Sequence, residues 1–298
     1  QDTSAPEGFE KSLKLEVGTA DSSIATSDAY RVTQAIEGQN FSQSDWGSST
    51  AKACVLSFYV KSSVTGTYGV GFANSAETEN YVAEYTINSA NTWEKKTISV
   101  PLRTSGTWLT TNGVGVGIRW DLGSGTNYNG TAGAWQTTSS KVYRTSSCVN
   151  LIATGSATWF LTGVQFEISS QASDFQHEDI GTTLAKCQRY YQSIRTNEGT
   201  PAYNGHINAS ASAEIVVPLI TEMRTSPTGI TVTNVGSWGI VTYGNLNRNS
   251  NSITFSGSSP KHVQLDVDDA SGGFTVGQGC MLYDASANGV IEFTGAEL

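Results

Sequence analysis

Residues 53–62, "ACVLSFYVKS", place Cys54, Leu56, Phe58 and Val60 at every second position. The side chains of a β-strand point alternately to its two faces, so this spacing predicts a strand with one buried face. Similar runs surround it, at residues 12–17, 29–36, 67–73, 80–88, 93–102, 114–122 and 157–169. Gly, Asn and Ser separate the runs, as they do in turns. Residues 1–175 are therefore predicted to form a jelly-roll-like β-sandwich.

A second series of short strand-like runs follows a linker that we predict at residues 196–203. Its members lie at 213–220, 229–235, 239–245, 252–257, 262–267, 279–285 and 289–298. Because these runs are short and closely spaced, residues 198–298 are predicted to form another β-sandwich. The predicted fold class is all-β, with two β-sandwich (jelly-roll-like) domains joined by a short helical segment within residues 176–197.

The helical segment shows a different period. In "LAKCQRYYQSI", residues 184–194, the apolar positions Leu184, Cys187, Tyr191 and Ile194 recur at the three- and four-residue spacing of one helix face. Thr182 or Thr183 is the predicted N-cap. A helix this short is unstable alone, so it must dock either on its own chain or on symmetry-related copies in a homotrimer. We predict that it is a connector or an assembly element.

Composition narrows the range of partners. The chain of 298 residues has a formal net charge of −9 and a sequence pI of about 4.8. An acidic surface repels nucleic acid and anionic membranes but is compatible with neutral sugars. No apolar run approaches the roughly 18 residues of a membrane-spanning helix, so no membrane insertion is expected. The first residues lack the features of a signal peptide. Because the sequence does not begin with Met, it is compatible with a fragment or a processed product.

Cysteine and histidine provide no chemical motif. Cys54, Cys148, Cys187 and Cys280 are far apart and form no C-x-x-C pair. Cys54 lies within an apolar run and is predicted to be a buried free thiol. The three histidines are also widely separated, and no nucleophile elbow, P-loop or zinc motif occurs. The sequence therefore predicts no catalytic residue, no metal site and no cofactor.

Carboxylates leave one enzymatic alternative open. Glu77 with Glu79, or Glu84 with Asp121, are the candidate pairs for glycosidic hydrolysis, although sequence spacing does not set their distance in space. The stretch "DVDDASGG", residues 266–273, lacks the spacing of a calcium loop and is interpreted as an acidic turn.

Aromatic residues are the best candidates for ligand contact. The chain has 7 Trp and 12 Tyr, several of them in polar contexts, including Trp46 and Trp108. Flat aromatic faces stack on pyranose rings, although Trp and Tyr also pack in sandwich cores. The long loop at 123–148 is a typical place for a binding site. The predicted glycan-binding residues are Trp120, Tyr128, Trp135, Tyr143, Trp238 and Tyr243.

Several longer strings resemble proteins of one family. They are "VLSFYVKSSVTGTYGVGF" (55–72), "YVAEYTINSANTWEKKTISVP" (81–101), "WDLGSG" (120–125), "WFLTGVQFEIS" (159–169), "LAKCQRYYQ" (184–192) and "IVVPLITEMRTSPTGITVT" (215–233). Together they resemble tailed-bacteriophage virion appendage (tail fibre) proteins, which carry a carbohydrate-binding-module-like jelly roll and a C-terminal β domain. The resemblance covers about residues 25–298. It departs from the family phrase "PFEHR" at Gln176 and Glu178.

The resemblance implies a virion location and a tail fibre or receptor-binding appendage that contacts host surface polysaccharide. It also implies a homotrimer in contact with other phage virion proteins, and it supplies no catalytic residue. Two alternatives remain open: a head fibre, capsid decoration or spacer protein, and a polysaccharide depolymerase.

Overall fold

The chain forms two compact units in the computed structural model, which describes residues 1–196, 201–242 and 247–298. The first unit comprises Gln1–His177 and the second Glu178–Glu297. Strands dominate both units, which confirms the all-β prediction. The boundary lies close to the expected limit at residue 175, and the helical segment belongs to the second unit rather than standing apart.

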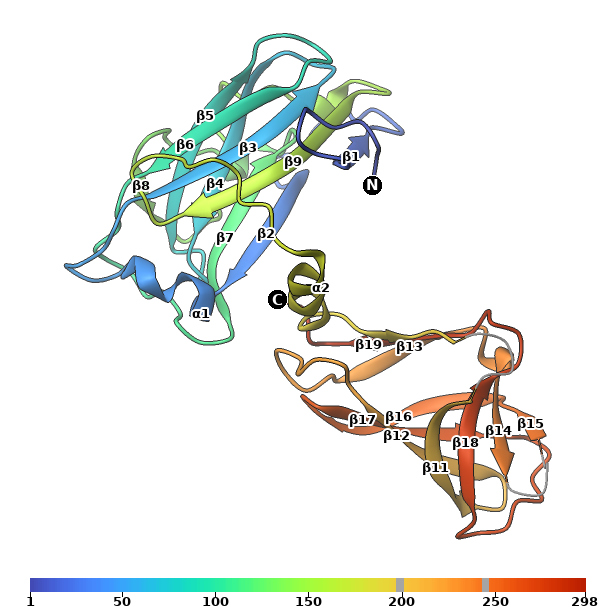
Figure 1. The fold of residues 1–298 in the computed structure, drawn as a ribbon. Helices are drawn as coiled ribbons and strands as arrows, with labels where there is room; N and C mark the ends of the chain where they lie inside the picture. The colour runs from blue at the N-terminus through green and yellow to red at the C-terminus, as the bar shows by residue number, and fades with distance from the viewer. Residues whose placement is uncertain (197–200, 243–246) are drawn as a thin grey trace. The chain divides into compact units, whose positions relative to one another are not determined.

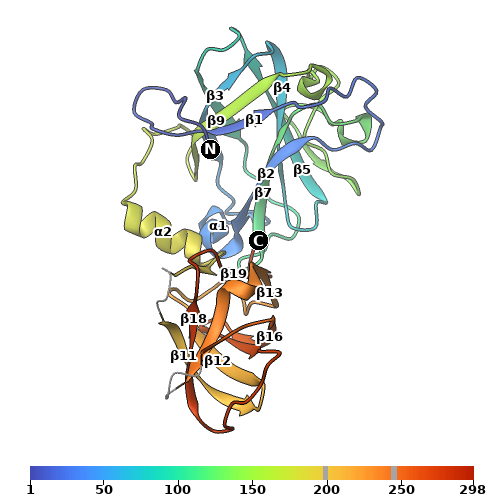
Figure 2. The same cartoon turned by 90° about the vertical axis from the view of Figure 1, so that its right-hand side faces the viewer.

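The first unit is built from two antiparallel sheets (Figure 1). The four-stranded sheet has the order β1 (Leu13–Glu16), β9 (Thr158–Glu167), β3 (Cys54–Ser62) and β6 (Glu94–Val100). The five-stranded sheet has the order β2 (Arg31–Glu37), β7 (Val114–Asp121), β4 (Gly66–Ala73), β5 (Glu79–Ile87) and β8 (Trp135–Thr137). Short helical turns lie between strands: α1 (Gly38–Phe41), η1 (Ser42–Ser44), η2 (Thr126–Tyr128) and η3 (Leu151–Ala153). The edge strands β1 and β2 face the viewer in Figure 2.

The two sheets of the first unit enclose one hydrophobic core. The alternating residues of β3, including Phe58 and Val60, are fully buried and belong to the same cluster as Phe72 of β4 and Ile118 of β7. Burial of such side chains contributes roughly 1.5–3 kcal/mol each, so this cluster is the main source of the unit's stability. Cys54 is a buried free thiol in the same cluster, as predicted.

Part of the long loop after β7 covers the outer face of the five-stranded sheet. A Cβ atom at Gly71 of β4 would lie 2.5 Å from the Cα of Tyr143, and one at Gly69 would lie 2.9 Å from the Cα of Arg144. Only glycine lets the loop approach the sheet so closely. Tyr143 and Arg144 are buried by this contact. This part of the loop, predicted to hold a ligand, is a structural cover instead.

The second unit also has two antiparallel sheets and a core of its own. The seven-stranded sheet has the order β15 (Asn247–Asn249), β14 (Trp238–Thr242), β18 (Gly279–Asp284), β11 (Pro201–Ala209), β12 (Ser212–Pro218), β17 (His262–Asp268) and β16 (Ser252–Ser259). The three-stranded sheet has the order β10 (Ser193–Ile194), β19 (Val290–Thr294) and β13 (Gly229–Thr233), and η4 (Val235–Ser237) precedes β14. Strand β11 pairs with both β12 and β18, so the linker predicted at 196–203 is wrong where it overlaps this strand.

The helical segment is shorter than its sequence period suggests. Helix α2 spans Ile180–Gln188, and its N-cap is Asp179, whose side chain accepts hydrogen bonds from the backbone N–H groups of Gly181 and Thr182. The predicted threonine N-caps are therefore wrong, because the carboxylate precedes them and caps the helix first. Leu184 and Cys187 lie in the helix and are exposed.

The last two residues of the predicted helical face lie beyond the helix. Tyr191 follows it, and its hydroxyl donates a hydrogen bond to the Glu292 carboxylate. Ile194 belongs to strand β10 and is buried in the core of the second unit. The four-residue helical face is therefore wrong beyond Gln188, because pairing with β19 takes over at Ser193. In the described parts of the chain, no helix has the length and apolar character needed to cross a membrane.

Candidate functional site

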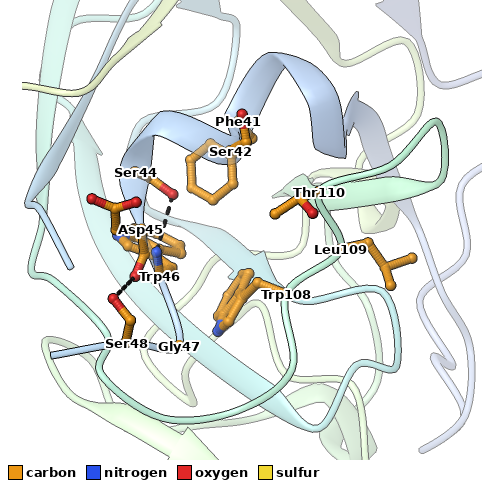
Figure 3. Close-up of a pocket in the computed structure, with 10 residues that line it drawn as sticks. All are labelled: Phe41, Ser42, Ser44, Asp45, Trp46, Gly47, Ser48, Trp108, Leu109 and Thr110. Carbon is orange, nitrogen blue, oxygen red and sulfur yellow. Dashed lines mark hydrogen bonds between the residues drawn. The ribbon is translucent and has the colours of Figure 1, made fainter. Parts of the chain in front are cut away.

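A surface pocket of about 230 Å³ lies where two connections between the sheets of the first unit meet (Figure 3). One connection leads from β2 through α1 and η1 to β3, and it supplies Phe41, Asp45 and Trp46. The other leads from β6 to β7 and supplies Trp108. We call this cavity the Trp108 pocket. It is smaller than the roughly 300–1,000 Å³ of typical small-molecule sites, so its size suits a single ring.

The pocket is lined by three aromatic rings, of which Trp108 is half-buried while Phe41 and Trp46 are 4% and 6% exposed and belong to the hydrophobic core. The ring centroid of Trp46 lies 4.8 Å from that of Phe41 and 4.7 Å from that of Trp108, both in edge-to-face contact. The centroids of Phe41 and Trp108 are 6.3 Å apart. These are contact distances for aromatic pairs, so the two buried rings support Trp108, which supplies most of the aromatic area that a ligand can reach.

Both indole N–H groups of the pocket are used by the protein itself. Nε1 of Trp46 donates to the carbonyl oxygen of Lys52 at 2.7 Å, and Nε1 of Trp108 donates to that of Ser105 at 3.1 Å. The rings are thus fixed in orientation before any ligand arrives. A preformed aromatic site loses little conformational entropy when a ligand binds, which favours affinity.

Hydroxyl groups and one carboxylate form the polar rim. Ser42, Ser44, Ser48 and Thr110 line the pocket beside Asp45 (Figure 3). The Ser48 hydroxyl donates to the carbonyl oxygen of Asp45 at 2.8 Å, and its oxygen accepts a hydrogen bond from the Thr50 N–H at 3.2 Å. Aromatic surface with adjacent hydroxyl and carboxylate groups is the composition expected for a ligand that has an apolar face and polar edges.

The first loop of the pocket is held by its own backbone. Asp45 adopts φ 55° and Gly47 adopts φ +89°, both in the left-handed region. The Asp45 N–H donates to the Ser42 carbonyl at 3.2 Å, and the Ser48 N–H donates to the Asp45 carbonyl at 3.1 Å. The Gly47 N–H donates to the Arg103 carbonyl at 2.8 Å, which ties this loop to the second one.

The second loop is anchored by a buried carboxylate. Glu79 of β5 is 5% exposed and accepts a hydrogen bond from Nε of Arg103 at 2.7 Å. The side-chain amide of Asn74 donates to the carbonyl oxygen of Thr107 at 3.0 Å. A charge-assisted bond between partly buried groups fixes position better than an exposed ion pair does. These contacts hold the residues on either side of the loop tip and thereby place Trp108.

Trp135, a predicted ligand contact, lies against the pocket aromatics but does not line the cavity. Its ring centroid is 5.1 Å from that of Trp46 and 5.7 Å from that of Trp108, both in edge-to-face contact. Its Nε1 donates to the Pro101 carbonyl at 2.9 Å, and the Arg103 guanidinium lies 5.7 Å from its centroid. Trp135 therefore acts as support for the pocket aromatics.

The other predicted ligand contacts in the described residues do not line the Trp108 pocket. Trp120, Tyr143 and Trp238 are fully buried, so the prediction of ligand contact is wrong for these three side chains. Tyr128 is half-buried, stacks on Tyr143 at 4.9 Å and does not line the Trp108 pocket. Tyr243 lies outside the described residues.

Sequence reasoning missed Phe41 and Asp45 and did not select Trp46 or Trp108. A signal for the two tryptophans was present, because each lies in a polar, glycine-containing turn: "SDWGS" at 44–48 and "SGTWLT" at 105–110. Neither turn shows strand periodicity, so neither tryptophan has a predicted place in a sheet. This feature distinguishes them from Trp120, which continues the buried face of a strand.

The carboxylates considered for hydrolysis all have partners in the structure. Glu77 forms ion pairs with Arg119 and Lys141, and Glu79 pairs with Arg103. The remaining two are Asp121, 3.5 Å from Nε of Arg144, and Glu84, which accepts a hydrogen bond from Thr145. Burial raises the pKa of Asp121, and the Arg144 cation opposes that shift. Within the described ranges, no three Cys, His, Asp or Glu side chains are grouped so as to hold a metal ion.

Comparisons with known proteins do not assign this chain to a family. No family model matches the sequence, and no curated protein matches it. Among solved structures, the cryo-EM structure of T=3 Penaeus vannamei nodavirus aligns over 99% of this chain and 94% of that chain. Its sequence identity to this chain is 11% and its TM-score is 0.16, so the similarity carries no argument about fold or function.

Proposed function

We propose that this chain is a non-enzymatic adhesion protein whose first unit binds a sugar ring in the Trp108 pocket. The observation that carries the proposal is the half-buried ring of Trp108, which packs on the buried rings of Phe41 and Trp46 and lies beside hydroxyl groups and Asp45. The C–H face of a pyranose would lie on the exposed part of Trp108, and its hydroxyl groups would bond to the rim. A site of this size holds one ring weakly, so useful adhesion depends on several copies acting together.

The proposed architecture is two jelly-roll-like β-sandwiches. It is supported by the pairs of antiparallel sheets that share a hydrophobic core in each unit. Such a scaffold places loops at its ends, and binding residues commonly lie on loops positioned by a rigid scaffold. The Trp108 pocket fits this arrangement, since both of its loops connect one sheet to the other.

We further propose that the protein is displayed on a phage virion as a tail fibre or receptor-binding appendage and assembles as a homotrimer. The virion assignment rests on the sequence resemblance across residues 25–298. The homotrimer is supported by α2, in which Ile180 is 78% exposed and Leu184 is 53% exposed. A nine-residue helix with no buried side chain needs additional contacts to be stable.

Adhesion of purified protein to host cells or to extracted host polysaccharide tests the proposed function. Trp108→Ala should reduce the affinity of the isolated site about tenfold or more, because aromatic anchors dominate small interfaces. Trp93→Ala is the matched control, since Trp93 is also half-buried but packs on Phe160 and Lys61 away from the pocket lining. Thermal unfolding of both variants checks that folding is retained.

Three outcomes would change the proposed function. Equal adhesion of wild type and Trp108→Ala would reject the pocket as the glycan site, and no adhesion by wild type would favour the head fibre or spacer alternative. The appearance of new reducing ends during incubation with polysaccharide would show a depolymerase and overturn the non-enzymatic proposal.

A further inference from the structure

We propose that Asp45 restricts the Trp108 pocket to uncharged pyranosides and rejects rings that carry a carboxylate. This inference rests on the proposed function and specifies the class of ligand. Among the described side chains that line the pocket, Asp45 alone carries a formal charge. Asp45 is therefore the one charged residue of this described lining.

A nearby cation offsets part of this charge. Nζ of Lys52 lies 3.4 Å from Oδ2 of Asp45 and also donates a hydrogen bond to the Gln43 carbonyl at 2.8 Å. The Asp45 side chain is 41% exposed, and Lys52 is not among the residues that line the pocket. Exposed ion pairs are weak in water, so a ligand meets a carboxylate that is only partly neutralised.

Asp45 is held beside the aromatic surface by its backbone. It ends η1 in the left-handed conformation, with φ 55° and ψ 22°, and immediately precedes Trp46. Its carbonyl oxygen accepts bonds from the Ser48 N–H and the Ser48 hydroxyl. The backbone that carries the carboxylate is thus a fixed turn and not a mobile chain end.

The chemistry of a carboxylate decides the class of ligand. Ionised carboxylates only accept hydrogen bonds, so they suit neighbouring hydroxyl groups of a neutral sugar ring. In a uronic acid, a carboxylate takes the place of the hydroxymethyl group of the ring. This carboxylate has no proton to donate to Asp45, and the like charge of Asp45 repels it. The rest of the acidic chain, with a net charge of −9, adds to this repulsion.

An aromatic cage for a cation is the competing interpretation, and the ring spacing opposes it. The three ring centroids are 4.7–6.3 Å apart, so the rings contact each other. A cation enclosed between aromatic faces lies within about 6 Å of each centroid and separates the rings. The pocket therefore offers the half-buried Trp108 ring for stacking, with Asp45 in its lining.

Matched ligands test the inference directly. The probes are methyl hexopyranosides of gluco, galacto and manno configuration and the uronic acid counterpart of each, measured by ligand-observed NMR. For the hexopyranoside that binds, wild type should prefer the neutral ring over its uronic acid about tenfold at low salt. The preference should fall as salt is added, because the pocket is open to solvent.

Two variants should change the preference for the neutral ring over its uronic acid in opposite directions. Asp45→Asn retains the left-handed turn, which asparagine tolerates, and should reduce the preference to about twofold or less. Lys52→Gln removes the partial neutralisation and should increase it. Glu222→Gln is the control, because Glu222 forms an exposed ion pair with Lys261 in the second unit and its loss should change nothing.

The outcomes separate this inference from the proposed function. Binding of neutral and acidic rings with equal affinity, unaffected by Asp45→Asn but lost in Trp108→Ala, would reject the role of Asp45 and keep the pocket. Absence of binding by every pyranoside would reject both. Stronger binding of the acidic ring by wild type would overturn the inference alone.

Discussion

At the scale of single residues, the pocket depends on one tight turn. Asp45 and Gly47 both adopt positive φ, and the Gly47 N–H reaches across to the second loop. A Cβ atom at Gly47 would lie 2.7 Å from the Gly106 carbonyl oxygen and 3.0 Å from Cδ1 of Trp108. The two loops can approach each other only because this position has no side chain.

Gly47→Ala should therefore destabilise the protein by about 1–3 kcal/mol, since it combines a left-handed backbone with a steric clash. It should also displace Trp108 and weaken glycan binding. Urea unfolding measures the first effect. Gly18→Ala is the control, because no atom lies within 4 Å of its Cβ position, and it should stay within about 0.5 kcal/mol of wild type. Equal stability of the two variants would show that the turn is more adaptable than described.

Single residues also show where sequence reasoning succeeds and where it does not. Trp120 follows Val116 and Ile118 at every second position, so the alternation that defines the strand also predicts a buried Trp120. The polar sequence neighbours of Trp120 suggested a glycan contact, but the strand alternation is the stronger indication. Trp46 and Trp108 lie in turns without periodicity, and their convergence depends on contacts between distant loops. Only the three-dimensional structure reveals that convergence.

At the scale of elements, most strands of the first unit were predictable to within a few residues. The expected runs at 53–62 and 80–88 correspond to β3 and β5, because regular alternation reports burial on one face directly. Strand β11 was missed. Its sequence "PAYNGHINA" contains Pro, Gly and Asn, and its residues pair well only because β12 and β18 lie on either side. Tertiary pairing there outweighs local propensity.

At the same scale, helix α2 provides a test of the proposed homotrimer. If its exposed residues form the contact between copies, Leu184→Asp should convert the homotrimer to monomer, because a buried carboxylate in a seam is costly. The stability of the isolated chain should change little, since Leu184 is 53% exposed. Light scattering after size exclusion gives the mass of each variant. A wild-type protein that is monomeric at tens of micromolar, or a variant that remains trimeric, would contradict the assembly proposal.

At the scale of the whole molecule, stability comes from two separate cores, each closed by antiparallel sheets. Their integrity can be followed through the cysteines, which are all free. Cys54 and Cys148 lie in the first unit and Cys280 in the second, all three buried, whereas Cys187 is exposed. Burial raises the pKa of Cys54 to about 12 and that of Cys280 to about 11, which suppresses their thiolate forms.

A thiol reagent at pH 8 should therefore modify no more than one thiol of the native protein rapidly, and that one should be Cys187. All four should react in denaturant. Ellman titration with and without guanidinium, followed by mass spectrometry of the modified peptide, measures both numbers. Rapid modification of two or more thiols before unfolding would mean that at least one core is open to solvent.

The central claim is that Trp108 and its neighbours form the glycan site, and fluorine NMR of protein labelled with fluorotryptophan tests it most directly. The seven tryptophans give separate signals, which single Trp→Phe variants assign. Titration with a bound pyranoside should shift the signals of Trp46 and Trp108 and leave those of Trp93, Trp159 and Trp238 unchanged. Binding that leaves Trp46 and Trp108 unmoved, or that shifts only tryptophans outside the pocket, would contradict the account.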